Sequence, residues 1–323
     1  MAETTPNISL KTLNRIANID EFKGRWESQG QLVANRLRAL QRIANMESTA
    51  AISRMMGIRC SDRQIGEFLS SHDSKCHLSK EEGDVVNAFH LVLKLVNDSY
   101  EQIPFIESHI MQMHDLLINR GKPAEPVGDE LQGKLSGLIG HVDKLIKEND
   151  LHPLMIIGDF SFRFWHMRPF HQGNNRLTWL LTQLLLLRHD YYFITYGSIT
   201  HFLEKRLADY HRSLLFTKAG EIVNPDPQAW LNLFLDVMVD LQENIVTKIN
   251  REKNLLRLST PLREIITTIQ EQGQATISQI MATTAMNRNT LKVRLRKLVA
   301  EEFLIQQGKG KATHYLLPEL RHQ

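Results

Sequence analysis

The sequence predicts an all-α fold class, in which a helical body precedes a small C-terminal winged helix-turn-helix domain with one β-hairpin. Three observations lead to this prediction. Apolar residues recur mostly at helical spacing along the 323 residues, and strand-like patterns are scarce. Helical patterning breaks near Pro261 and then resumes in shorter segments. Close to the C-terminus, two strand-like segments flank a Gly-Lys-Gly-Lys turn, which is typical of a β-hairpin.

The body is predicted to be a succession of helices. Ser61 is a suitable N-cap residue for one of them. Two prolines and two glycines within 121–128 predict a loop. Segment 176–187 is so strongly apolar that we expect it to form a buried central helix. The expected helices cover 31–46, 62–69, 81–100, 106–119, 131–147, 154–165, 176–187, 202–216 and 228–249.

Three regions are expected along the chain: an N-terminal arm at 1–30, a helical domain at 31–258 and the winged helix-turn-helix at 261–323. The winged helix-turn-helix is predicted from the order of elements in the last region. Three helices come first, and the hairpin follows them. These helices are expected over 262–271, 276–282 and 289–302, with the hairpin inside 303–317.

Composition narrows the class of protein. Cys60 and Cys76 form neither a CxxC pair nor a Cys/His spacing typical of metal sites, so we expect a reducing compartment and no metal centre. The N-terminal segment MAETTPNISL is polar and unlike a signal peptide. The longest apolar run, 184–187, is far shorter than the ~20 residues of a membrane span. We therefore expect a cytoplasmic protein without a membrane partner.

The basic excess is concentrated at the C-terminus. Residues 261–323 hold nine Lys or Arg and five Asp or Glu, a net +4, whereas the remaining residues hold 30 and 31, a net −1. No acidic residue occurs from 272 to 300. Three leucines of the 289–302 helix face its own domain, and its other face is polar and basic. The residues expected to contact double-stranded DNA are Arg288, Asn289, Thr290, Lys292, Arg294, Arg296 and Lys297, with Lys309 and Lys311 at the wing tip.

Two other interpretations of this region remain open. Its basic face can be an ordinary solvated surface of a small packing domain. Winged helices also serve as protein-interaction or dimerisation modules, which would make a homodimer the partner rather than DNA.

The segment 168–176, RPFHQGNNR, predicts an anion site. A turn with one glycine and two asparagines leads directly into the apolar helix, so backbone N–H groups and the positive end of the helix dipole point into the turn. Guanidinium groups suit phosphate. The alternative is an ordinary helix–helix turn with solvated arginines. The candidate phosphate or nucleotide ligands are Arg168, Gly173, Asn174, Asn175 and Arg176.

This segment resembles the signature loop of Fic (Fido-fold) proteins, whose pattern is HPFx(D/E)GNGRxxR. The resemblance extends to the flanking segments Phe160–Met167 and Leu180–Tyr191 and covers roughly residues 30–320. It implies a Fido-like helical bundle, for which a C-terminal winged helix is a common companion.

The resemblance also implies a chemistry. Fic enzymes transfer a nucleotide monophosphate, usually AMP from ATP, to a protein hydroxyl; the motif histidine is the general base and the Asp/Glu holds Mg²⁺. Here the histidine position is Arg168 and the Asp/Glu position is Gln172. The second motif glycine is Asn175, and the last motif arginine is Trp179. Arginine has no acceptor for a proton, and a neutral amide is a poor Mg²⁺ ligand.

No catalytic residue is therefore assigned with certainty. His166 and His171 are the neighbouring histidines that could replace the missing base. No cofactor is certain: a nucleotide or phosphate is the expected ligand, and Mg²⁺ is expected only if the protein is active.

Two further family features are altered. Residues 52–57, ISRMMG, align with the inhibitory pattern (S/T)xxxE(G/N), and Met56 takes the glutamate position. Core packing of this helix is the alternative interpretation. Only about ten residues near 119–128 stand where active relatives carry a target-positioning hairpin.

These features favour a degenerate, inactive Fic-family protein that acts as a DNA-binding transcriptional regulator, with a vestigial or ligand-sensing phosphate or nucleotide pocket. One alternative is an active Fic-type nucleotidyltransferase, a protein adenylyltransferase with altered catalytic residues. The other is a protein-interaction module that does not bind DNA.

Overall fold

The computed structural model describes residues 8–28, 34–70, 78–118, 129–214, 217–218, 221–222, 226–272, 274–308, 310 and 313–317. The chain divides into two compact units, Met1–Thr247 and Lys248–Gln323. The division falls inside helix α11, whereas the expected break near Pro261 corresponds to the junction between α11 and α12.

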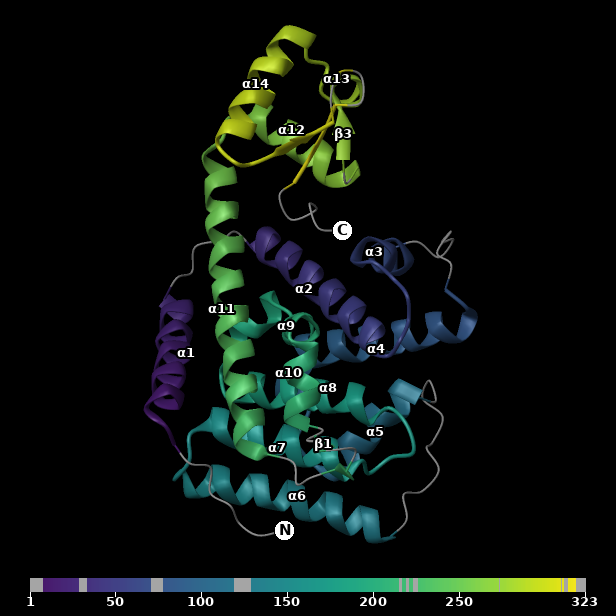
Figure 1. The fold of residues 1–323 in the computed structure, drawn as a ribbon, viewed down its shortest axis with the longest axis vertical. Helices are drawn as coiled ribbons and strands as arrows, with labels where there is room; N and C mark the ends of the chain where they lie inside the picture. The colour runs from purple at the N-terminus through teal and green to yellow at the C-terminus, as the bar shows by residue number, and fades with distance from the viewer. Residues whose placement is uncertain are drawn as a thin grey trace. The chain divides into compact units, whose positions relative to one another are not determined.

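The first unit is built almost entirely from helices, as predicted (Figure 1). A short two-stranded antiparallel hairpin, β1–β2, interrupts the helices before α11. Its elements are α1 (Leu10–Ser28), α2 (Ala34–Met55), α3 (Asp62–Ser70), α4 (Lys80–Ser99), η1 (Tyr100–Gln102), α5 (Glu107–Ile118), α6 (Asp129–Glu148), α7 (Pro153–Met167), α8 (Asn174–Arg188), η2 (Tyr192–Tyr196), α9 (Ile199–Lys205), α10 (Leu207–Leu214), β1 (Thr217–Lys218), β2 (Glu221–Ile222) and α11 (Pro227–Arg257).

Helix α8 is the central element of this unit. Every residue from Arg176 to Leu187 is buried, and α4, α5, α7 and η2 pack around the helix. A helix that is apolar on all sides can only be stable when it is surrounded. The prediction of a buried central helix is therefore confirmed.

The N-cap predicted at Ser61 is also confirmed. The Ser61 hydroxyl accepts a hydrogen bond from the Gln64 backbone N–H, and the Gln64 side chain accepts one from the Ser61 N–H, so α3 begins with the expected N-cap. Within the predicted N-terminal arm, α1 forms a helix that buries Ile16, Ile19 and Phe22.

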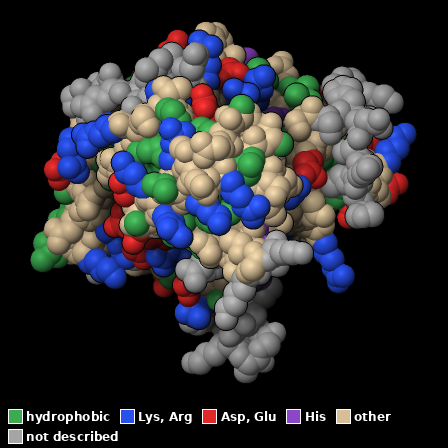
Figure 2. All heavy atoms as spheres, turned by 90° about the horizontal axis from the view of Figure 1, so that it is seen from above, with side chains coloured by type: hydrophobic (Ala, Val, Ile, Leu, Met, Phe, Trp, Pro, Cys, Tyr) green, Lys and Arg blue, Asp and Glu red, His purple; other side chains and the backbone are tan. Residues whose placement is uncertain are grey.

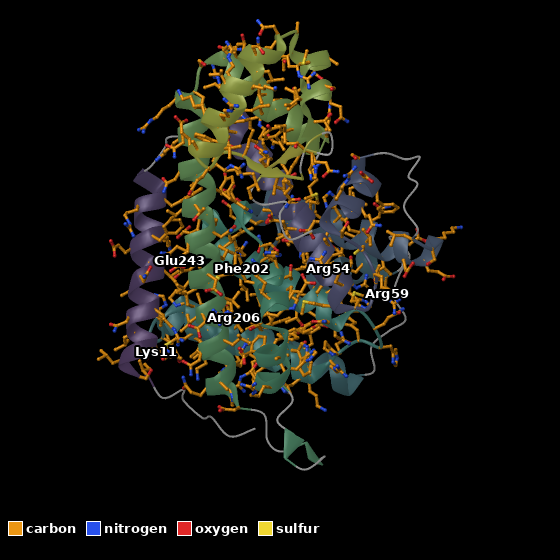
Figure 3. The ribbon with its side chains drawn as sticks, turned by 45° about the horizontal axis from the view of Figure 1, so that its top comes forward. Lys11, Arg54, Arg59, Phe202, Arg206 and Glu243 are labelled. Atoms are coloured by element: carbon orange, nitrogen blue, oxygen red, sulfur yellow. The ribbon has the colours of Figure 1, made fainter. Side chains whose placement is uncertain are left out.

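One predicted helix is divided. The segment expected as a single helix over 202–216 forms α9 and α10, which are separated at Arg206. The Arg206 backbone N–H closes the end of α9 on the Phe202 and Leu203 carbonyls (Arg206 and Phe202 are labelled in Figure 3). Its guanidinium donates to Asp240 of α11 at 2.7 Å. These contacts of Arg206 hold the chain in place where the two helices separate. The spacing of apolar residues continues across this position, so the sequence pattern alone predicts one helix.

Among its described residues, the second unit contains the end of α11, three whole helices and a three-stranded antiparallel sheet of order β3-β5-β4. Two of the strands, β4 and β5, form the hairpin expected around the Gly-Lys-Gly-Lys turn. Strand β3, which the sequence did not predict, pairs with β5. Its described elements are α12 (Thr260–Gln272), β3 (Gln274–Thr276), α13 (Ile277–Thr284), α14 (Arg288–Ala300), β4 (Ile305–Gln307) and β5 (His314–Leu316).

The core of the second unit joins these helices to the sheet. Ile265 and Ile269 of α12, Ile280 of α13 and Leu295 of α14 are fully buried in one apolar cluster, which also includes Tyr315 of β5. Across the described part of the chain, no helix is both long and apolar enough to cross a membrane.

Candidate functional site

The turn between α7 and α8 contains two residues in the left-handed region. Arg168 ends α7 with φ +45°, and Gly173 precedes α8 with φ +81°. A Cβ added at Gly173 would lie 2.8 Å from Ile118 Cδ1. Glycine is needed here both for its backbone conformation and for the close approach of α5.

The two asparagines of the turn are bound to protein groups. Asn174 holds the turn closed: its Oδ1 accepts from the Phe170 N–H at 3.0 Å, and its Nδ2 donates to the Phe170 carbonyl at 2.5 Å. Asn175 Oδ1 accepts from the Tyr210 hydroxyl of α10 at 3.0 Å. Both side chains therefore bind protein groups at the start of α8, and the backbone N–H groups of its first turn are the part of the turn that could hold an anion.

Arg176 is a buried cation without a carboxylate partner among the described residues. Its exposed fraction is 5%, its Nη1 donates to the Leu117 carbonyl at 3.4 Å, and its Nε has no hydrogen-bond partner. Burial lowers the pKa of the guanidinium from its ordinary value. A buried charge in this state is costly unless an anion accompanies it, so Arg176 is the residue of the turn best suited to hold a phosphate.

His114 of α5 braces the same turn. Its ring stacks on Phe170, with centroids 3.8 Å apart and planes inclined by 11°, and its Nε2 lies 3.0 Å from the Gln172 carbonyl. A carbonyl only accepts, so Nε2 carries the proton and the buried Nδ1 is left without a partner. Burial, and secondarily the charge of Arg176, lower the pKa of His114, partly offset by the Gln172 carbonyl and Asp115.

The sequence prediction missed His114. The available signal was its place on the apolar face of α5, with Ile110, Met113 and Leu117, where a histidine needs a polar partner. That partner lies 58 residues away along the chain, so no local pattern could identify it.

The positions to which the Fic pattern assigns catalytic roles hold other residues in this chain. Arg168 is exposed, and its guanidinium lies 5.1 Å from the centre of the Trp165 ring, a cation–π contact. Trp179, at the last arginine position, is buried against Tyr210 and Trp230, with centroids 6.1 and 5.8 Å apart. At this position the chain has aromatic packing where the Fic pattern has a charged arginine.

The donor set of the turn does not fit Mg²⁺. Gln172, at the position of the metal-binding carboxylate, is an exposed neutral amide. Within the residues that the structure describes, no group of three His, Cys, Asp or Glu side chains is arranged to hold a metal ion. No step through a metal ion is therefore derived for this turn.

The two histidines considered as replacement bases differ in their surroundings. His166 places Nδ1 at 2.8 Å from the Phe162 carbonyl and Nε2 at 3.1 Å from the Leu214 carbonyl, so both ring nitrogens are directed at backbone oxygens. His171 is exposed, and no described residue forms a hydrogen bond with it. His166 therefore has no ring nitrogen left for a substrate hydroxyl, and His171 lacks the orienting partner that usually accompanies a general base.

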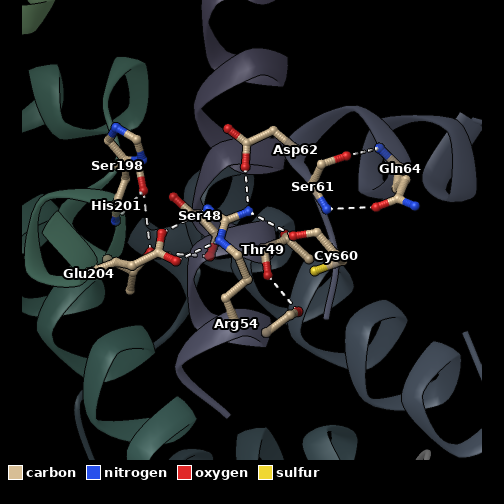
Figure 4. A network of polar contacts seen from close by, with 12 residues as sticks. Ser48, Thr49, Arg54, Cys60, Ser61, Asp62, Gln64, Ser198, His201 and Glu204 are labelled. Carbon is tan, nitrogen blue, oxygen red and sulfur yellow. Dashed lines mark hydrogen bonds and ion pairs between the residues drawn. The ribbon is translucent and has the colours of Figure 1, made fainter. Parts of the chain in front are cut away.

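The segment aligned with the inhibitory pattern lies at the end of α2. Ile52 is buried, as the core-packing interpretation expects, but Met56 is 41% exposed. Between them, Arg54 donates to both Glu204 oxygens at 2.5 and 2.7 Å and to Asp62 at 2.7 Å (Figure 4). The Glu204 hydrogen bonds are the main cause of the raised pKa of Arg54. The loop at 119–128 lies outside the described residues.

Seven of the nine candidate DNA-contacting residues lie on α14. The Asn287 side chain caps this helix by accepting from the Thr290 N–H at 2.9 Å. Leu291, Leu295 and Leu298 are fully buried. Arg288, Asn289, Lys292, Arg296 and Lys297 are exposed, Thr290 and Arg294 are half-buried, and Lys309 and Lys311 lie outside the described residues.

The first unit is thus a mainly helical body around one buried helix, which the chain enters through a Gly-Asn turn. Residues 104–186, which include this turn, match the model of the Fic/DOC family. A search of curated proteins finds no match. The comparisons therefore show that this segment is similar to the Fic/DOC family and that the fold of the chain is Fic-like.

Solved structures support the fold assignment. The chain is similar to a Fic family protein from Desulfovibrio desulfuricans G20, with a TM-score of 0.63 and 18% identity over 97% of this chain and 98% of that one. A Fic domain-containing signalling protein from Bacteroides thetaiotaomicron VPI-5482 gives 0.53 and 16%, over 72% and 95%. Fic-1 from C. elegans gives 0.58 and 15%, over 73% and 72%.

Proposed function

We propose that this protein is a cytoplasmic, DNA-binding transcriptional regulator in which a Fic-type body has lost its transferase chemistry. The observation that carries the proposal is the exposed face of α14. Four cations of this helix, Arg288, Lys292, Arg296 and Lys297, are exposed, and no acidic residue occurs from 272 to 300. Such a face suits the phosphate backbone of duplex DNA.

The arrangement of the second unit supports the same conclusion. The helix α14 follows α13 after a short turn, and a hairpin follows α14, which is the element order of a winged helix-turn-helix. The buried leucines of α14 leave its opposite face for a ligand. On the face of the molecule seen in Figure 2, Lys and Arg side chains lie among hydrophobic side chains, Asp and Glu side chains and other atoms.

Three features of the first unit support loss of transfer. Arg168 cannot accept a proton, Gln172 is a poor replacement for a metal-binding carboxylate, and Trp179 stands where the family pattern has its last, supporting arginine. What remains is the turn with the buried Arg176, which supports binding of a phosphate-bearing ligand without its transformation.

The DNA-binding part is tested with a matched pair of lysines. Lys297 lies 3.8 Å from Glu301 in α14, and Lys144 lies 3.7 Å from Glu148 in α6; both pairs are exposed and spaced i,i+4. Each substitution by alanine removes the same local ion pair, worth about 0.3–0.5 kcal/mol. We expect Lys297→Ala to weaken binding of the full-length chain to a fluorescent duplex and Lys144→Ala to leave it unchanged, as measured by anisotropy.

Absence of duplex binding by the wild-type chain, at low salt and with a native circular dichroism spectrum, would contradict the DNA-binding proposal. A protein-interaction module would then be the better description.

The inactivity part is tested with labelled ATP and Mg²⁺. We expect no incorporation of label into the chain or into added proteins. Incorporation that disappears in His171→Ala would instead establish an active transferase that uses this exposed histidine as its base.

A further inference from the structure

One row of side chains runs along the outermost line of α14. Successive helical residues are rotated by about 100°, so positions i, i+4 and i+7 lie almost in line. Asn289, Val293 and Arg296 occupy these positions, directly opposite the buried leucines. All three are exposed.

Val293 is the unusual member of this row. It is 65% exposed, although the helix buries three leucines completely. A single exposed apolar residue is ordinary on a protein surface. Here, however, Val293 lies between an amide and a guanidinium in the centre of a basic face. A polar side chain would be better solvated than valine at this position.

The three side chains match the chemical groups on base edges in the major groove. An amide pairs with adenine N6 and N7, a guanidinium pairs with guanine O6 and N7, and an apolar side chain contacts the 5-methyl group of thymine. The flanks of the row carry a different chemistry. Lys292 and Lys297 lie on its two opposite sides, where a helix in the groove faces phosphates.

We propose that Asn289, Val293 and Arg296 form a base-reading row, in which Val293 selects thymine through its methyl group. This inference rests on the proposed function, because it requires α14 to enter the major groove of duplex DNA. The absence of acidic residues from 272 to 300 favours DNA over an acidic or mixed-charge protein surface as the occupant.

The experiment combines a protein substitution with a change of one DNA methyl group. The full-length chain first selects its preferred site from a random duplex pool. Each thymine of that site is then replaced, one at a time, by deoxyuridine, which lacks the 5-methyl group. Binding to each duplex is measured by anisotropy for wild type and Val293→Ala. Val246→Ala is the matched control, since Val246 is an exposed valine of α11, at 40%.

At one thymine, wild type and Val246→Ala should bind the deoxyuridine duplex about fourfold more weakly, the factor expected for burial of one methyl-sized group. Val293→Ala should bind the two duplexes equally. Alanine favours helix formation over valine, so the substitution leaves α14 intact. Lys292→Ala should weaken binding to all duplexes alike, because it would contact phosphate.

The outcomes separate the inference from the proposed function. If wild type binds a selected site but no thymine is sensitive to loss of its methyl group, the base-reading role of Val293 is wrong and DNA binding stands. The same conclusion follows if Val293→Ala retains the wild-type sensitivity. If wild type binds no duplex at all, the proposed function fails, and this inference fails with it.

Discussion

Helices α8 and α14 place arginines in opposite environments. Gly173, in the left-handed region, is the N-cap of α8, whereas Asn287, in extended conformation, is the N-cap of α14. In α8 the guanidinium of Arg176 is buried in an apolar helix, without a carboxylate partner among the described residues. In α14 four of the five cations are exposed, Arg294 is half-buried, and the buried residues are leucines.

The difference shows that burial determines which kind of anion a positive side chain is suited to bind. A buried guanidinium gains strongly from one well-placed anion, because little water competes for it. Exposed lysines and arginines each gain little, and they act together on an extended polyanion in a salt-dependent way. We therefore expect α8 to serve a small phosphate-bearing ligand and α14 to serve DNA.

The largest expected effect is a difference in stability between substitutions on the buried and on the exposed face of α14. Leu295→Ala should destabilise the second unit by about 2–5 kcal/mol, because it leaves a cavity in the core. Val293→Ala should change stability by less than about 0.5 kcal/mol. Urea unfolding followed by circular dichroism measures both changes.

The tryptophans sharpen this test, because all four, Trp26, Trp165, Trp179 and Trp230, belong to the first unit. Leu295→Ala should lower the circular dichroism transition more than the tryptophan fluorescence transition. Equal shifts in the two signals would contradict the division into two units.

The next effect concerns the turn before α8. Gly173→Ala places a Cβ at φ +81° and 2.8 Å from Ile118, so we expect a loss of roughly 1–3 kcal/mol in the tryptophan fluorescence transition. Gly133→Ala in α6 is the control, because its Cβ would meet nothing within 4 Å. There, alanine should stabilise the helix by about 0.5–1 kcal/mol. A neutral Gly173→Ala would show that the turn is not tightly packed.

A smaller effect compares the two arginine environments directly. Arg176→Met removes a buried charge and should stabilise the ligand-free chain by about 1 kcal/mol. The same variant should lose any thermal stabilisation by pyrophosphate. Arg296→Met should leave both properties unchanged, since Arg296 is exposed. Loss of stability in ligand-free Arg176→Met would mean that the fold already neutralises this charge.

The smallest expected effect is a dependence on pH. Burial lowers the pKa of His90, His114 and His201 in the folded first unit. The unfolded chain then binds more protons than the folded one below about pH 6.5, so the free energy of unfolding should fall as the pH decreases from there. His114→Gln should reduce this slope in urea titrations monitored by tryptophan fluorescence. An unchanged slope would remove His114 from the explanation.

Features of the fold that depend on local composition could be predicted from the sequence. The leucines at 184–187 have no polar residue among them, so the helix that carries them had to be buried. The N-cap at Ser61 and the β4–β5 hairpin likewise follow from neighbouring residues.

Features that depend on distant contacts could not be predicted. The break at Arg206 depends on Asp240, 34 residues away. Strand β3 has only three residues and exists through its backbone pairing with β5. The site was predicted as an anion-binding turn, but the sequence did not indicate that Asn175 would bind Tyr210 or that His114 would brace the turn.

The salt dependence of duplex binding tests the central claim about α14 most directly. Each lysine that neutralises a phosphate contributes about 1 to the slope of log affinity against log salt concentration. The account predicts that Lys292→Ala and Lys297→Ala each reduce the slope of the full-length chain by about 1, whereas Lys144→Ala leaves it at the wild-type value. Identical slopes for all four chains would contradict the assignment of α14 as the DNA-binding helix.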